Sequence, residues 1–149
     1  MHLMEDRGSK NPLLRYLIAA PLIWLPLPFV LMADLILELY HQIAFPIYGI
    51  PKVKRSQYIR IFDREKLPYL SLPEKIGCAY CGYVNGWLHY ASVVAGRTES
   101  YFCAIAHLQV RGYKPSEHEL HFMKYGDEAA LKKRYFLHAH RHESDASTT

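Results

Sequence analysis

The chain has 149 residues, half of them hydrophobic, and a formal net charge of +4. That length suits one compact domain, or a membrane element joined to one small domain. The charge is too small for a dedicated nucleic-acid binder, so no nucleic-acid partner is expected. Only three cysteines are present, and this odd, small number excludes a secreted scaffold held together by disulfides.

The first predicted element is a membrane helix. Residues 16–33 contain no charged side chain, and a helix of this length rises roughly 27 Å, close to the ~30 Å hydrocarbon core of a bilayer. We predict a transmembrane helix over residues 13–39, with the lipid bilayer as its partner. Pro21, Pro26 and Pro28 each remove a backbone donor, so the helix is kinked, or it is a re-entrant or interfacial helix–break–helix. A cleaved signal peptide or a buried core helix would also produce an apolar segment of this kind.

Basic residues flank this helix unequally. Arg7, Lys10 and Arg15 precede it, and Lys52, Lys54, Arg55, Arg60, Arg64 and Lys66 follow it. Because cytoplasmic flanks carry the excess of Lys and Arg, the C-terminal domain is predicted to lie in the cytoplasm. The basic stretch 51–60 is also suited to contact anionic lipid head groups, although an ordinary stop-transfer flank explains it equally well.

Composition divides the chain into five segments. They are a polar N-terminus (1–12), the membrane helix and its exit segment (13–45), a basic linker (46–72), a small helical metal-site domain (73–142) and a disordered tail (143–149). The predicted fold is therefore mainly α: an N-terminal transmembrane helix, kinked or re-entrant, followed by a small helical domain.

Local signals place the elements after the membrane helix. Residues 57–62 alternate polar and apolar and predict a short strand. Pro73 suits the first position of a helix, and residues 76–110 follow a largely helical pattern with Asn85-Gly86 and Gly96 as candidate breaks. Ser116 to Glu119 has the form of a capping box, and residues after Gly126 again favour a helix.

The cysteines and one histidine form the clearest chemical pattern. Cys78 and Cys81 make a C-x-x-C, and Cys103 and His107 make a C-x-x-x-H. Side chains three or four positions apart share a helix face, so each pair can point one way. If the two pairs converge, three thiolates and one imidazole form a Cys3His site of the kind that binds structural zinc, with iron as the alternative metal. Because the turn formers lie off the midpoint, we expect a loop-borne C-x-x-C and a helical C-x-x-x-H.

Other interpretations of the same residues stay open. The cysteines can be small buried core residues, or Cys78 and Cys81 can form a redox dithiol. His89 lies in an apolar stretch and is predicted to be buried rather than to bind a metal. The pairs His118/His121 and His138/His142 have metal-binding spacing but are better explained as polar surface.

Three strings of this chain are familiar. FPIYGIPKVKRSQYI, EKIGCAYCGYVNG and RTESYFCAIAH together resemble an uncharacterised family of small bacterial membrane-associated proteins with the pattern CxYCxYxNG…RTExYxCxIxH. The resemblance covers roughly residues 41–107. It implies a bacterial origin, hence the inner (cytoplasmic) membrane, and it implies no activity. The matching positions are Cys78, Cys81, Asn85, Gly86, Arg97, Glu99, Cys103 and His107.

These observations predict a membrane-anchored accessory or interaction protein whose cytoplasmic domain is organised by a structural zinc ion on Cys78, Cys81, Cys103 and His107. A membrane-protein partner fits this prediction. The alternative is a membrane-bound redox or metal-dependent enzyme, or an electron carrier, that uses the same centre. No catalytic residue, small-molecule substrate or reaction is assigned, and none of the common hydrolase, phosphate-binding or dinucleotide-binding motifs occurs.

Overall fold

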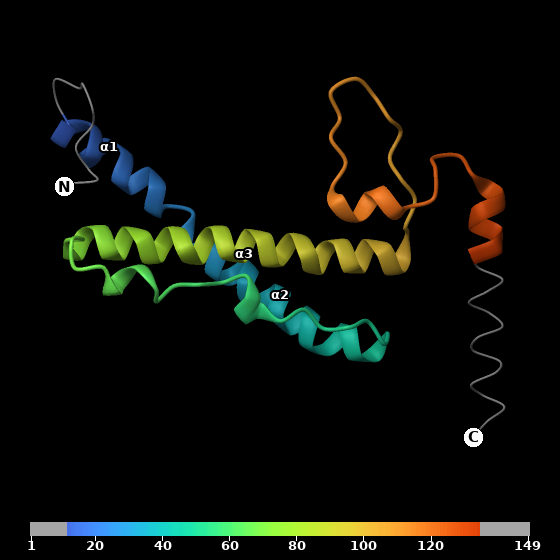
Figure 1. Ribbon diagram of the computed structural model, residues 1–149, viewed down its shortest axis with the longest axis horizontal. Helices are drawn as coiled ribbons and strands as arrows, with labels where there is room; N and C mark the ends of the chain where they lie inside the picture. Colours follow the sequence, from blue (N-terminus) through green and yellow to red (C-terminus); the bar gives the residue numbers. More distant parts are fainter. Residues whose placement is uncertain (1–11, 135–149) are drawn as a thin grey trace. The chain divides into compact units, whose positions relative to one another are not determined.

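The computed structural model describes residues 12–134 (Figure 1). Its α-helices up to residue 102 are α1 (Pro12–Trp24), α2 (Leu27–Ile47) and α3 (Leu72–Phe102). Three short 3-10 helices are η1 (Arg55–Gln57), η2 (Arg64–Lys66) and η3 (Glu117–His121). Within 12–134 no strand forms, so the predicted mainly α fold is confirmed. The chain divides into two compact units, residues 1–95 and 96–149, which are described separately below.

The predicted membrane helix is two helices. The Leu25 N–H still donates to Pro21 O (2.9 Å), and the Val30 N–H then donates to Pro26 O (3.0 Å), so one helix ends where the next begins. Pro28 lies in the first turn of α2, where its missing N–H costs nothing. Taken together across this break, residues 17–47 are long and apolar enough to cross a membrane, by length and composition. The prolines thus produce a break, as the sequence predicted.

Gly49 ends α2 and turns the chain back. Its φ of +64° lies in the left-handed region that glycine adopts without strain, and its N–H donates to Pro46 O at 3.2 Å. The residues that follow return to the helices: Ile50 and Val53 are buried with Phe45 of α2 and with Tyr90 and Val94 of α3. These five residues are the core of the first unit.

The predicted strand over residues 57–62 is wrong. This segment begins with the end of η1 and continues as an irregular chain that lies on α3. A Cβ added to Gly82 would lie 2.5 Å from Arg60 O, and one added to Gly86 would lie 2.6 Å from Tyr58 O. The alternating pattern arises because the segment packs one side against a helix, with no neighbouring strand to pair with.

The helix α3 begins as predicted, one residue before Pro73. Ser71 donates from its N–H (2.8 Å) and its hydroxyl (2.7 Å) to Glu74 Oε2, which closes the first turn. The candidate breaks at Asn85-Gly86 and Gly96 do not interrupt it. Those glycines serve close packing instead, since Gly86 admits the Tyr58 backbone. The helix ends at Phe102, and Ala104 turns the chain away with a φ of 48°.

The second unit joins the end of α3 to the segments after it. The Ala106 N–H donates to Met123 O (2.8 Å) and the Met123 N–H to Ala104 O (2.9 Å), which forms a single parallel bridge. The predicted capping box is present at η3, where the Ser116 N–H donates to Glu119 Oε1 at 3.0 Å. Residues 128–134 are helical, which confirms the predicted helix after Gly126 over its described part.

Candidate functional site

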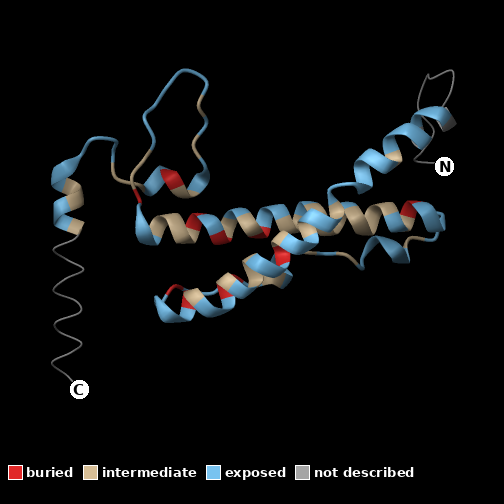
Figure 2. Cartoon of the chain, turned by 180° about the vertical axis from the view of Figure 1, so that it is seen from behind, coloured by how far each residue is buried: buried red, intermediate tan, exposed pale blue. Residues whose placement is uncertain are grey.

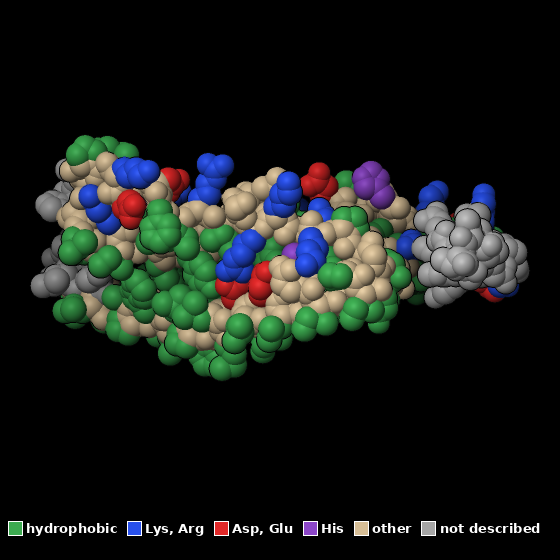
Figure 3. Space-filling view, turned by 90° about the horizontal axis from the view of Figure 1, so that it is seen from below, with side chains coloured by type: hydrophobic (Ala, Val, Ile, Leu, Met, Phe, Trp, Pro, Cys, Tyr) green, Lys and Arg blue, Asp and Glu red, His purple; other side chains and the backbone are tan. Residues whose placement is uncertain are grey.

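The helix α2 buries Asp34, His41 and Phe45 and leaves most of its large apolar side chains exposed. Asp34 and His41 are buried at 8% and 1% relative exposure. The large apolar side chains exposed on α2 and just after it are Phe29, Leu31, Met32, Leu35, Ile36, Leu39, Ile43, Ile47 and Tyr48. Figure 2 shows the mostly exposed surface of α1 and α2, and Figure 3 shows hydrophobic side chains gathered on one face of the molecule. A helix of a water-soluble domain shows the opposite arrangement.

The buried carboxylate on α2 is held by an arginine of the linker. Arg55 donates from Nη1 to Asp34 Oδ1 and from Nη2 to Asp34 Oδ2, both at 2.5 Å. The same guanidinium lies 3.5 Å from Glu38 Oε2. This two-pronged geometry is the strongest that an arginine and a carboxylate can form. The hydrogen bond to Asp34 raises the pKa of Arg55 further above its ordinary value.

A tyrosine of α3 completes the surroundings of the carboxylate. The Tyr83 hydroxyl donates to Asp34 Oδ2 at 2.6 Å. Burial, together with this hydrogen bond, raises the pKa of Tyr83 to about 12. Asp34 therefore joins α2, the linker and α3 at one point, and each of its oxygens has a donor.

A second chain of hydrogen bonds runs through His41. The Val53 N–H donates to His41 Nε2 at 2.9 Å, which leaves the ring proton on Nδ1, 3.0 Å from the Tyr90 hydroxyl oxygen. The Tyr90 hydroxyl in turn donates to Glu38 Oε2 at 2.9 Å. Burial and the hydrogen bond to Glu38 raise the pKa of Tyr90. His41 thus lies neutral between a backbone amide and a tyrosine.

These contacts form one polar network, made of Asp34, Glu38, His41, Arg55, Tyr83 and Tyr90. A partly buried network whose groups are paired fixes the relative position of the elements that carry them. The sequence analysis did not identify this network. The helical spacing of 34, 38 and 41 on one face of α2 is the signal that could have found the network.

The predicted Cys3His site is not shown by the structure. Within residues 12–134, no group of three or more His, Cys, Asp and Glu side chains is arranged to hold a metal ion. Cys78 and Cys81 lie near the beginning of α3, and Cys103 follows its last residue. At about 1.5 Å per residue, the unbroken helix between these positions is roughly 30 Å long. Three thiols on one ion would require a break in α3, and residues 72–102 form one unbroken helix, so the structure does not bring the four predicted ligands together.

The local geometry of the two cysteine pairs is the reverse of what we expected. The C-x-x-C is helical, with Cys78 partly exposed and Cys81 exposed. The C-x-x-x-H is not, because the chain leaves the helix at Cys103 and Ala104 adopts a positive φ. The His107 ring instead lies edge-on to Tyr113, with centroids 5.7 Å apart.

The other histidines singled out in the sequence differ in their surroundings. His118 Nε2 lies 2.9 Å from Glu99 Oε2, and its ring covers Gly96, where a Cβ would lie 2.8 Å from His118 Nδ1. His89 is exposed, so the prediction that it is buried is wrong. The pair His138 and His142 lies outside the described residues.

No protein family, curated protein or solved structure matches this chain.

Proposed function

We propose that this is a monotopic membrane protein: α1 and α2 lie in one leaflet, and the rest of the chain stays at the cytoplasmic surface as an accessory or interaction protein. The observation that carries the proposal is that α2 exposes large apolar side chains and buries a carboxylate between them. Leu35 and Ile36 are 63% and 61% exposed while Asp34 beside them is buried. Exposed apolar patches of this extent mark surfaces that contact lipid or protein.

The contacts of α2 favour the one-leaflet arrangement over a span. Asp34 is bonded to Arg55, and Lys52 donates to Gln42 at 2.6 Å. A spanning α2 would draw these linker cations into the hydrocarbon core, where each charge costs several kcal/mol. With only the outer face of α2 in lipid, the cations stay at head-group level.

The break between α1 and α2 supports the same proposal. Two helices joined at a proline break can lie along one leaflet, each with its apolar side in lipid, because the freed backbone groups at the break find local partners. In that arrangement both basic flanks of the segment lie on the cytoplasmic side, which agrees with the excess of Lys and Arg on cytoplasmic flanks. The bacterial inner membrane remains part of the proposal on the resemblance alone.

Vesicle flotation tests membrane binding. Purified protein is mixed with vesicles of phosphatidylethanolamine and phosphatidylglycerol, and we expect it to float with them. The double variant Leu35→Gln/Ile36→Gln should weaken partitioning at least about tenfold, since burying each side chain contributes roughly 1.5–3 kcal/mol. The matched control Leu108→Gln/Leu120→Gln removes two apolar side chains, 57% and 66% exposed, that lie outside α1 and α2. Equal binding of both variants, or no binding of the parent protein, overturns the proposal.

A labelling experiment separates one leaflet from a span. In a background with all three native cysteines replaced by serine, Lys10→Cys and Lys54→Cys are made singly and treated with a membrane-impermeant maleimide. In inside-out vesicles from a bacterial host we expect both to be labelled. Labelling of Lys54→Cys alone shows a span and overturns the one-leaflet arrangement.

A further inference from the structure

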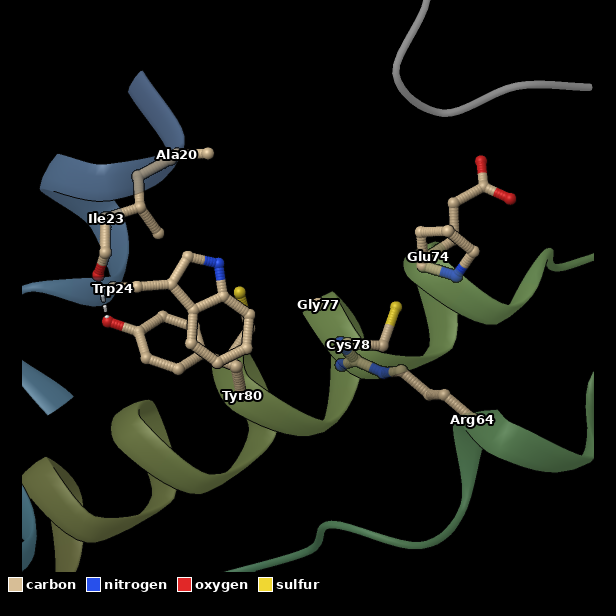
Figure 4. A pocket seen from close by; sticks show the side chains of 10 residues that line it. Ala20, Ile23, Trp24, Arg64, Glu74, Gly77, Cys78 and Tyr80 are labelled. Atoms are coloured by element: carbon tan, nitrogen blue, oxygen red, sulfur yellow. Dashed lines mark hydrogen bonds between the residues drawn. The ribbon is translucent and has the colours of Figure 1, made fainter. Parts of the chain in front are cut away.

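A small cavity lies where the end of α1 meets the beginning of α3. Its volume is about 290 Å³, and Trp24, Arg64, Cys78, Tyr80 and Cys81 are among the residues that line it. Figure 4 shows the Arg64 side chain extending toward Cys78, and Tyr80 lying beside Trp24. Both cysteines of the first unit, Cys78 and Cys81, therefore line this cavity.

The cavity opens among side chains that we assign to lipid. Ile23 and Trp24 line it and are also 52% and 38% exposed on α1. The Tyr80 hydroxyl donates to Ile23 O at 2.6 Å, and the rings of Trp24 and Tyr80 lie with centroids 4.7 Å apart. This contact fixes the end of α1 on α3. A molecule dissolved in the bilayer therefore reaches the cavity without crossing water.

Cys78 and Cys81 lie one helical turn apart on α3, and both line the cavity. On a helix, Cβ atoms three positions apart lie about 5–6 Å apart, and a disulfide needs about 3.5–4.5 Å. A slight tightening of one turn of α3 therefore joins Cys78 to Cys81. Arg64 and Glu74 line the same cavity, and the Arg64 guanidinium supplies a positive charge that can stabilise a developing quinol anion.

We propose that Cys78 and Cys81 are a redox-active dithiol that is oxidised by a membrane quinone bound in this cavity. Both S–H bonds break and one S–S bond forms. Two electrons and two protons pass to the two carbonyl oxygens of the quinone, which leaves as the quinol. A quinone suits the site because it is a flat, apolar two-electron acceptor that dissolves in lipid, and the cavity offers it aromatic walls beside two thiols. The inference rests on the proposed membrane association.

The test uses the full chain, reduced and freed of reductant in detergent micelles without oxygen. Duroquinone is the probe, because its fully methylated ring blocks addition of thiols to open ring positions. We expect one quinol per protein, loss of two titratable thiols, and a mass lower by two hydrogens. Tryptic mapping should assign the disulfide to Cys78 and Cys81.

Variants locate the reaction. Cys78→Ser and Cys81→Ser should each abolish quinol formation, and Cys103→Ser should leave it unchanged. Arg64→Leu should slow it about tenfold, the effect of losing one charge-assisted contact of roughly 1.4 kcal/mol, while Lys66→Leu should not. Circular dichroism of each variant checks that the helices are intact. In the Trp87→Phe background, quenching of Trp24 fluorescence by duroquinone in the Cys78→Ser/Cys81→Ser variant measures binding without reaction.

Two results overturn the inference. One is that the thiols stay reduced with duroquinone but are oxidised by the water-soluble disulfide of glutathione. The other is that quinol forms equally in Cys103→Ser and Cys78→Ser. Because the assay is done in micelles, its failure leaves the vesicle-binding result untouched, and failure of vesicle binding leaves the micelle chemistry measurable.

Discussion

The Asp34 carboxylate and the Arg55 guanidinium, 21 residues apart in the chain, face each other through two hydrogen bonds of 2.5 Å. This pair joins the apolar helix α2 to the basic linker. Because Tyr83 of α3 donates to the same carboxylate at 2.6 Å, the position of α2 relative to α3 depends on it. The pair explains why a helix rich in exposed apolar residues keeps one charged face turned inward.

Removing one partner of this pair should destabilise the first unit. Arg55→Ala leaves the Asp34 carboxylate buried without its main donor, and we expect the free energy of unfolding to fall by about 2–4 kcal/mol. Urea unfolding in micelles, followed by circular dichroism, measures this. Lys54→Ala is the matched control, because Lys54 is an exposed neighbouring cation, and it should change stability by less than about 0.5 kcal/mol. Equal effects of the two variants would contradict the structural role of the pair.

Gly86→Ala should also be costly. The new Cβ would lie 2.6 Å from Tyr58 O and 2.9 Å from Ile59 Cα, and backbone atoms cannot give way as a flexible side chain can. We expect a loss of about 1–3 kcal/mol in unfolding free energy, as for overpacked cores. Gly77→Ala provides the control on the same helix: nothing lies within 4 Å of its new Cβ, so helix propensity alone should stabilise the protein by up to ~1 kcal/mol. Destabilisation by both substitutions would count against the close approach at Gly86.

Acid should loosen the turn at η3. The Tyr113 hydroxyl, followed by the Ser116 backbone N–H, holds the pKa of Glu119 below its usual 4.5. Its contribution to stability is therefore complete above pH 4.5 and is lost as the pH falls through the lowered folded pKa. We expect the backbone amides of residues 116–119 to lose protection from hydrogen exchange over that interval.

Substitutions at two neighbouring glutamates check this assignment. Glu119→Gln should remove the acid-dependent loss of protection, because its side chain does not titrate. Glu117→Gln, on the exposed side of the same turn, should keep the parent profile. A Glu119→Gln profile identical to that of the parent protein would show that another group is responsible.

Metal analysis tests the predicted Cys3His site directly. Because α3 separates Cys78 and Cys81 from Cys103, we expect protein purified without an affinity tag to contain much less than one zinc or iron atom per chain. A chelator should leave the melting temperature unchanged, and so should Cys103→Ser and His107→Ala. Stoichiometric metal that is lost in both variants would mean that the chain assembles the site after all.

Features set by local chemistry could be predicted from the sequence. The proline break before α2, the beginning of α3 at Ser71 and Glu74, and the capping box at Ser116 each depend on residues within a few positions of one another. Such signals act before any tertiary contact forms, so the sequence carries them in full. The segment 57–62 shows the limit, because its alternation records packing against glycines of α3 and not pairing with a strand.

The candidate sites needed the three-dimensional structure. His41 and His89 both lie in apolar surroundings in the sequence, yet His41 is buried at 1% exposure and His89 is exposed. Which face of a helix is covered depends on the residues that pack against it. For His41 these are Val53 and Tyr90, which lie far from it in the sequence. The same limit applies to the cysteines, since spacing could not reveal that one unbroken helix runs between Cys81 and Cys103.

The core of the first unit has a practical consequence. Phe45 of α2, with no exposed surface, packs with Tyr90 and Val94 of α3. A fragment trimmed to start after Pro51, as is often done to obtain a water-soluble domain, would strip these aromatic and aliphatic groups of their cover. Such a fragment should precipitate or remain molten, and detergent extraction of the intact polypeptide is the route to folded material.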